Sequence, residues 1–237
     1  VSKTTVSAAL DRTETKNYIE DIRLDASSVR LTEAGLGLTH GRRLGNAYFN
    51  LDLGWQRGLP LLGAERDRHL PREAAHAQYN KYTFTGSLLV PFSVLSQSLS
   101  LESIAFWQKS EDVLHSPRQV GLGGQSSVRG FKEQTLYGST GGYWRTQIGW
   151  RHAVPWTWLQ PVCREAGIAL AWDIGAIERD EGNRYTGQHG RLSGHALELS
   201  ASGRYARVRM TLARSEKRPA AFRKHETPFW FRVDLTY

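Results

Sequence analysis

The sequence predicts an all-β fold, and more specifically an antiparallel transmembrane β-barrel. Three observations predict it. Apolar and polar residues alternate with a period of two along most of the 237 residues. The alternating segments are roughly nine to fourteen residues long, as tilted membrane-spanning strands need, whereas soluble strands average about five or six. Short turns alternate with long polar loops, which is typical of outer-membrane barrels.

The N-terminal quarter contains four alternating segments. Residues 6–11 and 34–39 alternate clearly, and a weaker pattern lies between them at 18–25. Residues 45–56 alternate cleanly, and we expect strands at all four segments. In this last segment the apolar and polar faces are Ala47, Phe49, Leu51, Leu53 and Trp55 against Asn46, Tyr48, Asn50, Asp52 and Gly54.

Residues 58–80 break the pattern with prolines, glycines and charges, which predicts a loop. Within this loop we expect a short helix at 72–78. Alternation resumes at 82–92, where Pro91-Phe92-Ser93 predicts a short turn. The next strand is expected at 99–107.

The segment at 110–142 is long and lacks clean periodicity. At its centre, residues 123–131 read Gly-Gly-Gln-Ser-Ser-Val-Arg-Gly-Phe. Loops of this length inside compact proteins are usually functional or disordered. The pattern is also compatible with an ordinary turn, so its interpretation depends on the rest of the chain.

Five more alternating segments follow the loop and bring the expected total to about eleven strands. They lie at 143–151, 168–174, 197–201, 206–212 and 229–237. Two of the four connections between them, at 178–190 and 215–228, are polar loops. Residues 155–161 predict a turn that contains two tryptophans, and Ser202-Gly203 predicts a short turn. The last segment is the sharpest, because one face carries five apolar residues: Phe229, Phe231, Val233, Leu235 and Tyr237.

The polar face of the expected strands carries many charges. They are Asp52, Glu102, Arg145, Arg151, Asp173, Arg207, Arg209, Arg232 and Asp234. A closed barrel with an apolar outside and a wet, charged lumen explains this pattern without a second apolar layer. The alternative is a large soluble β-sandwich or a lipocalin-like barrel. In the barrel interpretation, the residues expected to line the lumen include Arg145, Gln147, Arg207 and Arg209.

Composition narrows the possible functions. The formal net charge is +8, but the basic residues are scattered, so we expect no nucleic-acid partner. A single cysteine, Cys163, excludes an intrachain disulfide. We find no Gly-x-Ser-x-Gly elbow, phosphate loop or metal-ligand spacing, and the eight histidines are dispersed. We therefore expect no enzyme, no cofactor and no metal; a hydrolase site in the lumen is the alternative.

One ion pair is a candidate functional feature. By strand parity Asp173 faces the lumen, and Gly175 lies on the same face. If the glycine-rich loop enters the lumen, the Arg129 guanidinium can meet the Asp173 carboxylate away from bulk water. Sequence spacing alone favours the alternative, in which Arg129 is a solvated loop residue.

Short motifs in and after the loop resemble one family. They include a loop tip, Val128-Arg129-Gly130-Phe131, and a later strand, Trp172-Asp173-Ile174-Gly175. Gly142-Tyr143-Trp144-Arg145 and Leu192-Ser193-Gly194 resemble two further strand motifs in the same order. The loop tip is similar to the Val-Arg-Gly-Tyr/Phe motif, and the later strand to the Phe-x-Asp-x-Gly motif, of two-partner secretion transporters. This is the TpsB family of FhaC, ShlB and CdiB, which is distantly related to BamA.

The resemblance implies a bacterial outer-membrane barrel of sixteen strands with a long lumenal loop. Residues 1–237 would form one translocator domain with about the last eleven strands, without the plug helix, periplasmic domains and first strands. It also implies a monomer that contacts outer-membrane lipid and exports a large partner exoprotein, such as an adhesin, haemolysin or contact-dependent toxin. The alternatives are a BamA- or TamA-like assembly factor and a passive porin.

The resemblance assigns site residues as well. The lumenal loop tip would consist of Val128, Arg129, Gly130 and Phe131. Asp173 and Gly175 would anchor this tip. Two departures stand out. Gln147 occupies a position where the family usually has glutamate, and Ser139 one where it often has aspartate. Asp173 therefore becomes the main expected partner of Arg129.

Overall fold

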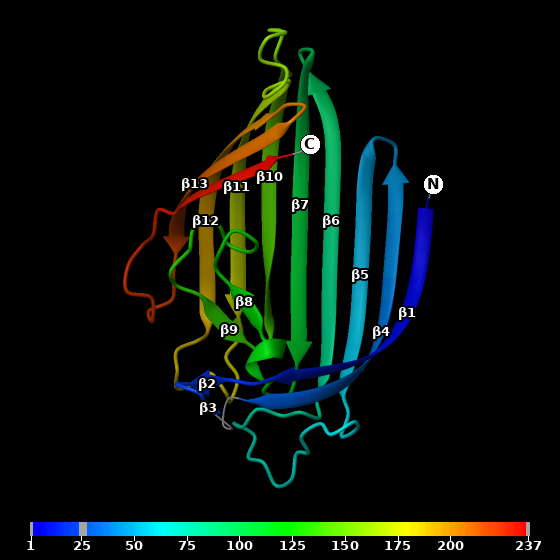
Figure 1. Cartoon of the computed structure of the whole chain (residues 1–237), viewed down its shortest axis with the longest axis vertical. Helices are drawn as coiled ribbons and strands as arrows, with labels where there is room; N and C mark the ends of the chain where they lie inside the picture. The colour runs from blue at the N-terminus through cyan, green and yellow to red at the C-terminus, as the bar shows by residue number, and fades with distance from the viewer. Residues whose placement is uncertain (1, 24–27, 236–237) are drawn as a thin grey trace.

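A computed structural model describes residues 2–23 and 28–235 of the chain. It contains a ten-stranded antiparallel sheet in which each strand pairs with its neighbours in chain order, and β1 and β14 lie at the two edges. Figure 1 shows that the sheet curls around a concave face. Its strands are β1 (Ser2–Thr15), β4 (Val29–Leu44), β5 (Ala47–Gly58), β6 (Asn80–Val94), β7 (Gln97–Ser110), β10 (Gly141–Ala153), β11 (Glu165–Ile177), β12 (Gly190–Ser202), β13 (Ala206–Lys217) and β14 (Phe229–Leu235).

The predicted all-β antiparallel fold is confirmed, but the weak segment at 18–25 is not a strand of this sheet. It forms a separate hairpin of β2 (Tyr18–Ile19) and β3 (Ile22–Arg23). Glu20 and Asp21 reverse the chain with positive φ angles of 46° and 65°, as a two-residue hairpin turn requires. Residues 24–25 of this segment and 236–237 of the predicted last strand lie outside the described residues.

The predicted turn at Pro91-Phe92-Ser93 is wrong. Strand β6 continues through it, and the chain reverses at Leu95 and Ser96, whose φ angles are 48° and 62°. The ladder between β5 and β6 ends at Leu89. Because Pro91 lies beyond that ladder, its missing N–H need not interrupt the sheet.

The predicted helix at 72–78 is also wrong. The Asp67 carboxylate instead accepts hydrogen bonds from the backbone N–H groups of Ala77 and Gln78, at 2.9 and 2.7 Å. The His76 N–H donates to the Val113 carbonyl at 2.8 Å. These long-range bonds occupy the donors that a helix would need.

The two faces of the sheet have opposite character. On β11, Leu170 and Trp172 are 62% and 63% exposed on the convex face, whereas Ala171 and Asp173 on the concave face are 7% and 0% exposed. Apolar side chains therefore point outward, as a membrane barrel requires. In the described ranges, no helix has the length and apolar character needed to cross a membrane.

The main buried core lies between the long loop and the concave face. The loop contains the 3₁₀ helix η2 (Ser116–Arg118), β8 (Val120–Leu122) and β9 (Leu136–Gly138), which lie inside the curve of the sheet (Figure 1). Side chains of the loop pack on those of β11, β12 and the connection before β14. This cluster comprises Val120, Leu122, Val128, Phe131, Leu136, Ile177, Leu192 and Phe222.

Candidate functional site

The tip of the long loop is a compact turn that projects Arg129. Gly123 and Gly124 have φ angles of +119° and +100°, which L side chains rarely adopt. The Gly124 N–H donates to the Phe131 carbonyl at 2.7 Å and closes the turn. The Ser127 hydroxyl accepts from the Gly123 N–H at 3.0 Å and donates to the Gly123 carbonyl at 3.1 Å.

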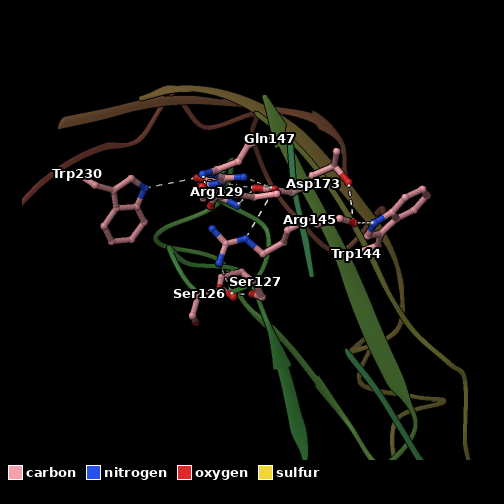
Figure 2. Close-up of polar contacts among 12 residues, drawn as sticks. Ser126, Ser127, Arg129, Trp144, Arg145, Gln147, Asp173 and Trp230 are labelled. Carbon is pink, nitrogen blue, oxygen red and sulfur yellow. Dashed lines mark hydrogen bonds and ion pairs between the residues drawn. The ribbon is translucent and has the colours of Figure 1, made fainter. Parts of the chain in front are cut away.

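Arg129 and Asp173 form a buried, bidentate ion pair (Figure 2). Arg129 Nε donates to Asp173 Oδ2 and Nη2 to Oδ1, both at 2.7 Å, and the Arg129 backbone N–H donates to Oδ2 at 3.0 Å. The side chains are 2% and 0% exposed. A two-pronged, charge-assisted contact of this kind fixes direction as well as distance.

Gln147 of β10 also binds Arg129 and is the third residue of this site. Arg129 Nη1 donates to Gln147 Oε1 at 2.8 Å, and Gln147 Nε2 donates to Glu102 Oε2 of β7 at 3.0 Å. The neutral side-chain amide of Gln147 therefore bridges Arg129 and the Glu102 carboxylate on the neighbouring strand. We call Arg129, Gln147 and Asp173 the tip anchor.

Arg145 supports the same site. It lies directly opposite Asp173 in the β10–β11 ladder. Its Nε is 3.8 Å from Asp173 Oδ1, and its Nη1 donates to the Ser126 carbonyl of the loop at 3.0 Å. Figure 2 shows Arg145 reaching towards Ser126. Two arginines thus share one buried carboxylate, and Glu102 is linked to this pair through Gln147.

Small residues on the wall allow the loop to approach. A Cβ at Gly175 would lie 3.0 Å from Leu122 Cδ1 and 3.1 Å from Val128 Cγ2. A Cβ at Gly194 would lie 3.1 Å from the Gly130 Cα and 2.8 Å from the Arg214 carbonyl oxygen. Gly194 and Gly130 therefore pack backbone to backbone. Leu192-Ser193-Gly194 was visible as a sequence motif, but its role as a docking surface was not predicted.

Apolar side chains on both sides of Arg129 fix the tip. Val128 and Phe131 are 0% exposed. The ring of Phe131 packs edge-on against Phe222, with centroids 5.6 Å apart. The structure therefore brings Val128, Arg129, Gly130 and Phe131 together with Asp173 and Gly175.

Sequence reasoning missed Glu226, which lies in the connection before β14. Its carboxylate accepts from the backbone N–H groups of Lys132, Glu133 and Gln134, at 2.7, 2.9 and 3.2 Å. The Gln134 side-chain amide donates to it as well, at 2.8 Å. Burial acts to raise the pKa of Glu226, but these hydrogen bonds outweigh burial and hold the pKa below its ordinary value. Glu226 is an isolated acidic residue in a polar loop, so no sequence pattern pointed to it.

Trp230 of β14 completes the surroundings of the tip. Its Nε1 faces the Arg129 carbonyl at 3.5 Å, and the Lys132 ammonium lies 4.9 Å from the centre of its ring (Figure 2 shows the first contact). Sequence reasoning did not link Trp230 to the loop.

Arg207 and Arg209 lie apart from the tip anchor. They line a polar cavity of about 470 Å³ that also reaches Arg129, Arg145 and Gln147. Arg209 Nε pairs with Glu198 Oε1 at 3.2 Å. The four residues expected in the lumen thus share one cavity, but only Arg145 and Gln147 contact the loop tip or its ion pair.

Comparison with known proteins gives consistent matches. Residues 1–201 match the family model for haemolysin secretion/activation proteins ShlB/FhaC/HecB. The outer membrane transporter CdiB of Dickeya dadantii is 28% identical over 235 residues, covering 99% of this chain and 40% of that protein. CdiB of Escherichia coli O6:K15:H31 is 33% identical over 200 residues, covering 84% and 32%.

A solved structure agrees with these matches. CdiB from Escherichia coli superposes with a TM-score of 0.86 and 29% identity, over 98% of this chain and 41% of that chain. The chain thus spans about 40% or less of the length of the relatives it matches.

Proposed function

Because the chain belongs to the ShlB/FhaC/HecB family of haemolysin secretion/activation proteins, we propose that it forms the barrel wall through which one large partner exoprotein is exported. The chain is an outer-membrane protein. The partner would be an adhesin, a haemolysin or a contact-dependent toxin. We also propose that residues 1–237 are part of a single translocator domain that acts as a monomer and contacts outer-membrane lipid through its convex face.

The observation that carries this proposal is the loop held inside a polar lumen by a buried ion pair. An export channel must be narrowed between substrates and cleared during export, and a loop held in the lumen by a buried ion pair can serve both states. Arg129 and Asp173 would hold the narrowing loop. The path of an extended substrate chain would be lined by polar side chains that keep the path hydrated, namely Arg145, Gln147, Arg207 and Arg209. These roles are structural and gating roles.

A gene deletion with complementation tests the function. We expect loss of one large protein from the culture supernatant, with unchanged uptake of small solutes, and recovery with the wild-type gene. If secretion persists while small-solute uptake falls, the protein is a porin. If many outer-membrane proteins disappear together, the protein is an assembly factor.

A further inference from the structure

The base of the long loop is held by a second buried polar cluster that is separate from the tip. Arg118 is the last residue of η2, and its Nη2 contacts a carboxylate oxygen of Glu33 on β4. The same nitrogen donates to Thr13 Oγ1 of β1 at 2.7 Å. The Tyr79 hydroxyl donates to the other Glu33 oxygen. We call Glu33, Tyr79 and Arg118 the root anchor.

The root anchor is largely shielded from water. Glu33 is 6% and Tyr79 1% exposed, and the Arg118 side chain is 18% exposed. Burial, followed by the hydrogen bond to Glu33, raises the pKa of Tyr79 above its ordinary value, so Tyr79 remains a donor. Removing Arg118 would leave the Glu33 carboxylate buried without its ion-pair partner, which is costly.

Backbone contacts tie both limbs of the loop to the same place. Gln108 Nε2 on β7 donates to the Arg118 carbonyl at 2.9 Å and to the Ser139 carbonyl at 3.1 Å. Ser139 Oγ accepts from the Leu114 N–H at 3.0 Å. The outgoing limb at Arg118 and the returning limb at Ser139 are therefore fixed together at the root.

The two anchors lie on different parts of the sheet. At the root anchor the loop contacts β1 and β4, whereas at the tip anchor it contacts β10 and β11. Strands β5, β6 and β7 lie between these two parts of the sheet. The loop consequently runs along the concave face from one part of the wall to the other. The cavity of about 470 Å³ lies at the tip, and a second polar cavity of about 560 Å³, lined by Glu33, Lys81 and Arg118, lies at the root.

From this geometry we infer that Glu33, Tyr79 and Arg118 are positioning residues that hold the loop in the lumen independently of the Arg129–Asp173 pair. Two restraints on one loop act in parallel, so breaking the tip anchor alone leaves the loop across the lumen. Clearing the lumen then requires release at both ends. This inference rests on the proposed export function for its biological meaning, but not for its test.

The test is a double-mutant cycle in the full-length protein, with single-channel conductance in planar bilayers as the readout. The variants are Arg118→Ala, Arg129→Ala and the double variant, with Arg68→Ala at an exposed loop arginine as a matched control. We expect the double variant to raise the open probability about tenfold beyond the product of the two single effects. If Arg129→Ala alone opens the channel as fully as the double variant, the inference is overturned.

Two further variants separate a specific ion pair from general packing. In the Arg129→Ala background, Arg118→Lys keeps the positive charge and should stay mostly closed, whereas Arg118→Gln should open. If both variants open equally while heat-modifiable migration shows a folded barrel, the ion-pair role is wrong. The conductance measurement needs no secreted partner, so its outcome is independent of the secretion assay. The root-anchor inference can therefore be overturned while the secretion assay still supports export. Equally, the export proposal can be overturned while the conductance result still supports the root anchor.

Discussion

The two halves of the sheet use the same alternation but treat their concave faces differently. One row of concave positions across β11, β12 and β13 is buried, namely Ala171, Ala196 and Ala213. On β1 and β5 the concave positions are exposed, as at Asp11 and Asp52. We call these the covered wall and the bare wall. The difference teaches that the period of two sets which side chains face the lumen but does not decide which of them are buried.

The largest expected effect comes from removing the charge that holds the loop on the covered wall. Asp173→Ala leaves the Arg129 guanidinium buried without its partner and should destabilise the docked loop by about 3–5 kcal/mol. Trypsin cleavage after Arg129 in the folded full-length protein measures this release, and we expect cleavage to become rapid.

Asp52→Ala on the bare wall is the matched control. Asp52 is exposed and accepts from Thr39 Oγ1 at 2.7 Å. We expect an effect within about 0.5 kcal/mol, as for most surface positions. If Asp52→Ala and Asp173→Ala give equal cleavage, the distinction between the walls is lost.

The next largest effect should come from enlarging one concave residue of the covered wall. Gly194→Val would place side-chain atoms against the Gly130 backbone and should cost about 1–3 kcal/mol through overpacking. The expected readout is increased trypsin cleavage after Arg129. Gly37→Val on β4, directly opposite Ser7 of the bare wall, is the comparison: it meets the far end of the Ser7 side chain, which can move. Equal cleavage in both variants would contradict the account.

A smaller and pH-dependent effect is expected at Glu226, which lies outside the strands. Its folded-state pKa is lowered, so its contribution is present above the ordinary glutamate range and is lost as the pH falls through the folded pKa. Protection of the segment at 132–134 from hydrogen exchange, corrected for intrinsic rates, should therefore weaken on acidification. Glu226→Gln should remove most of this pH dependence, and an unchanged pH profile would refute the assignment.

The smallest effect is expected from restoring glutamate at position 147. Gln147→Glu would strengthen the contact with Arg129 but would place a second carboxylate beside Glu102. We therefore expect near-neutral heat stability for the single variant and a gain of roughly 1 kcal/mol when Glu102→Gln is added. Additive effects of the two changes would show that Gln147 does not couple Arg129 to Glu102.

Much of this architecture was predictable because period-two alternation is a local signal. It identified the ten strands of the sheet and the face on which Asp173 lies. The turn at Leu95 and Ser96 was missed because these residue types carry no signal for positive φ. The placement of Arg129 beside Asp173 needed the family resemblance, since spacing alone could not bring a loop into the lumen.

The remaining site residues depend on contacts between distant parts of the chain. Arg118 and Glu33 are 85 positions apart, and Glu226 holds a segment 92–94 positions away. Each is an ordinary charged residue in its local sequence. Only the folded loop brings such residues together, so no pattern in a single segment could have revealed them.

The most direct test of the central claim is disulfide formation between the loop tip and the covered wall. Val128→Cys and Gly175→Cys in a Cys163→Ser background place two cysteines where Val128 Cγ2 and a Cβ at position 175 are 3.1 Å apart, close enough for a disulfide. In intact outer membranes, we predict nearly complete crosslinking of the full-length protein on mild oxidation. Absence of the crosslink, with the cysteine introduced at position 128 instead labelled by a membrane-impermeant maleimide, would contradict a loop tip held inside the lumen.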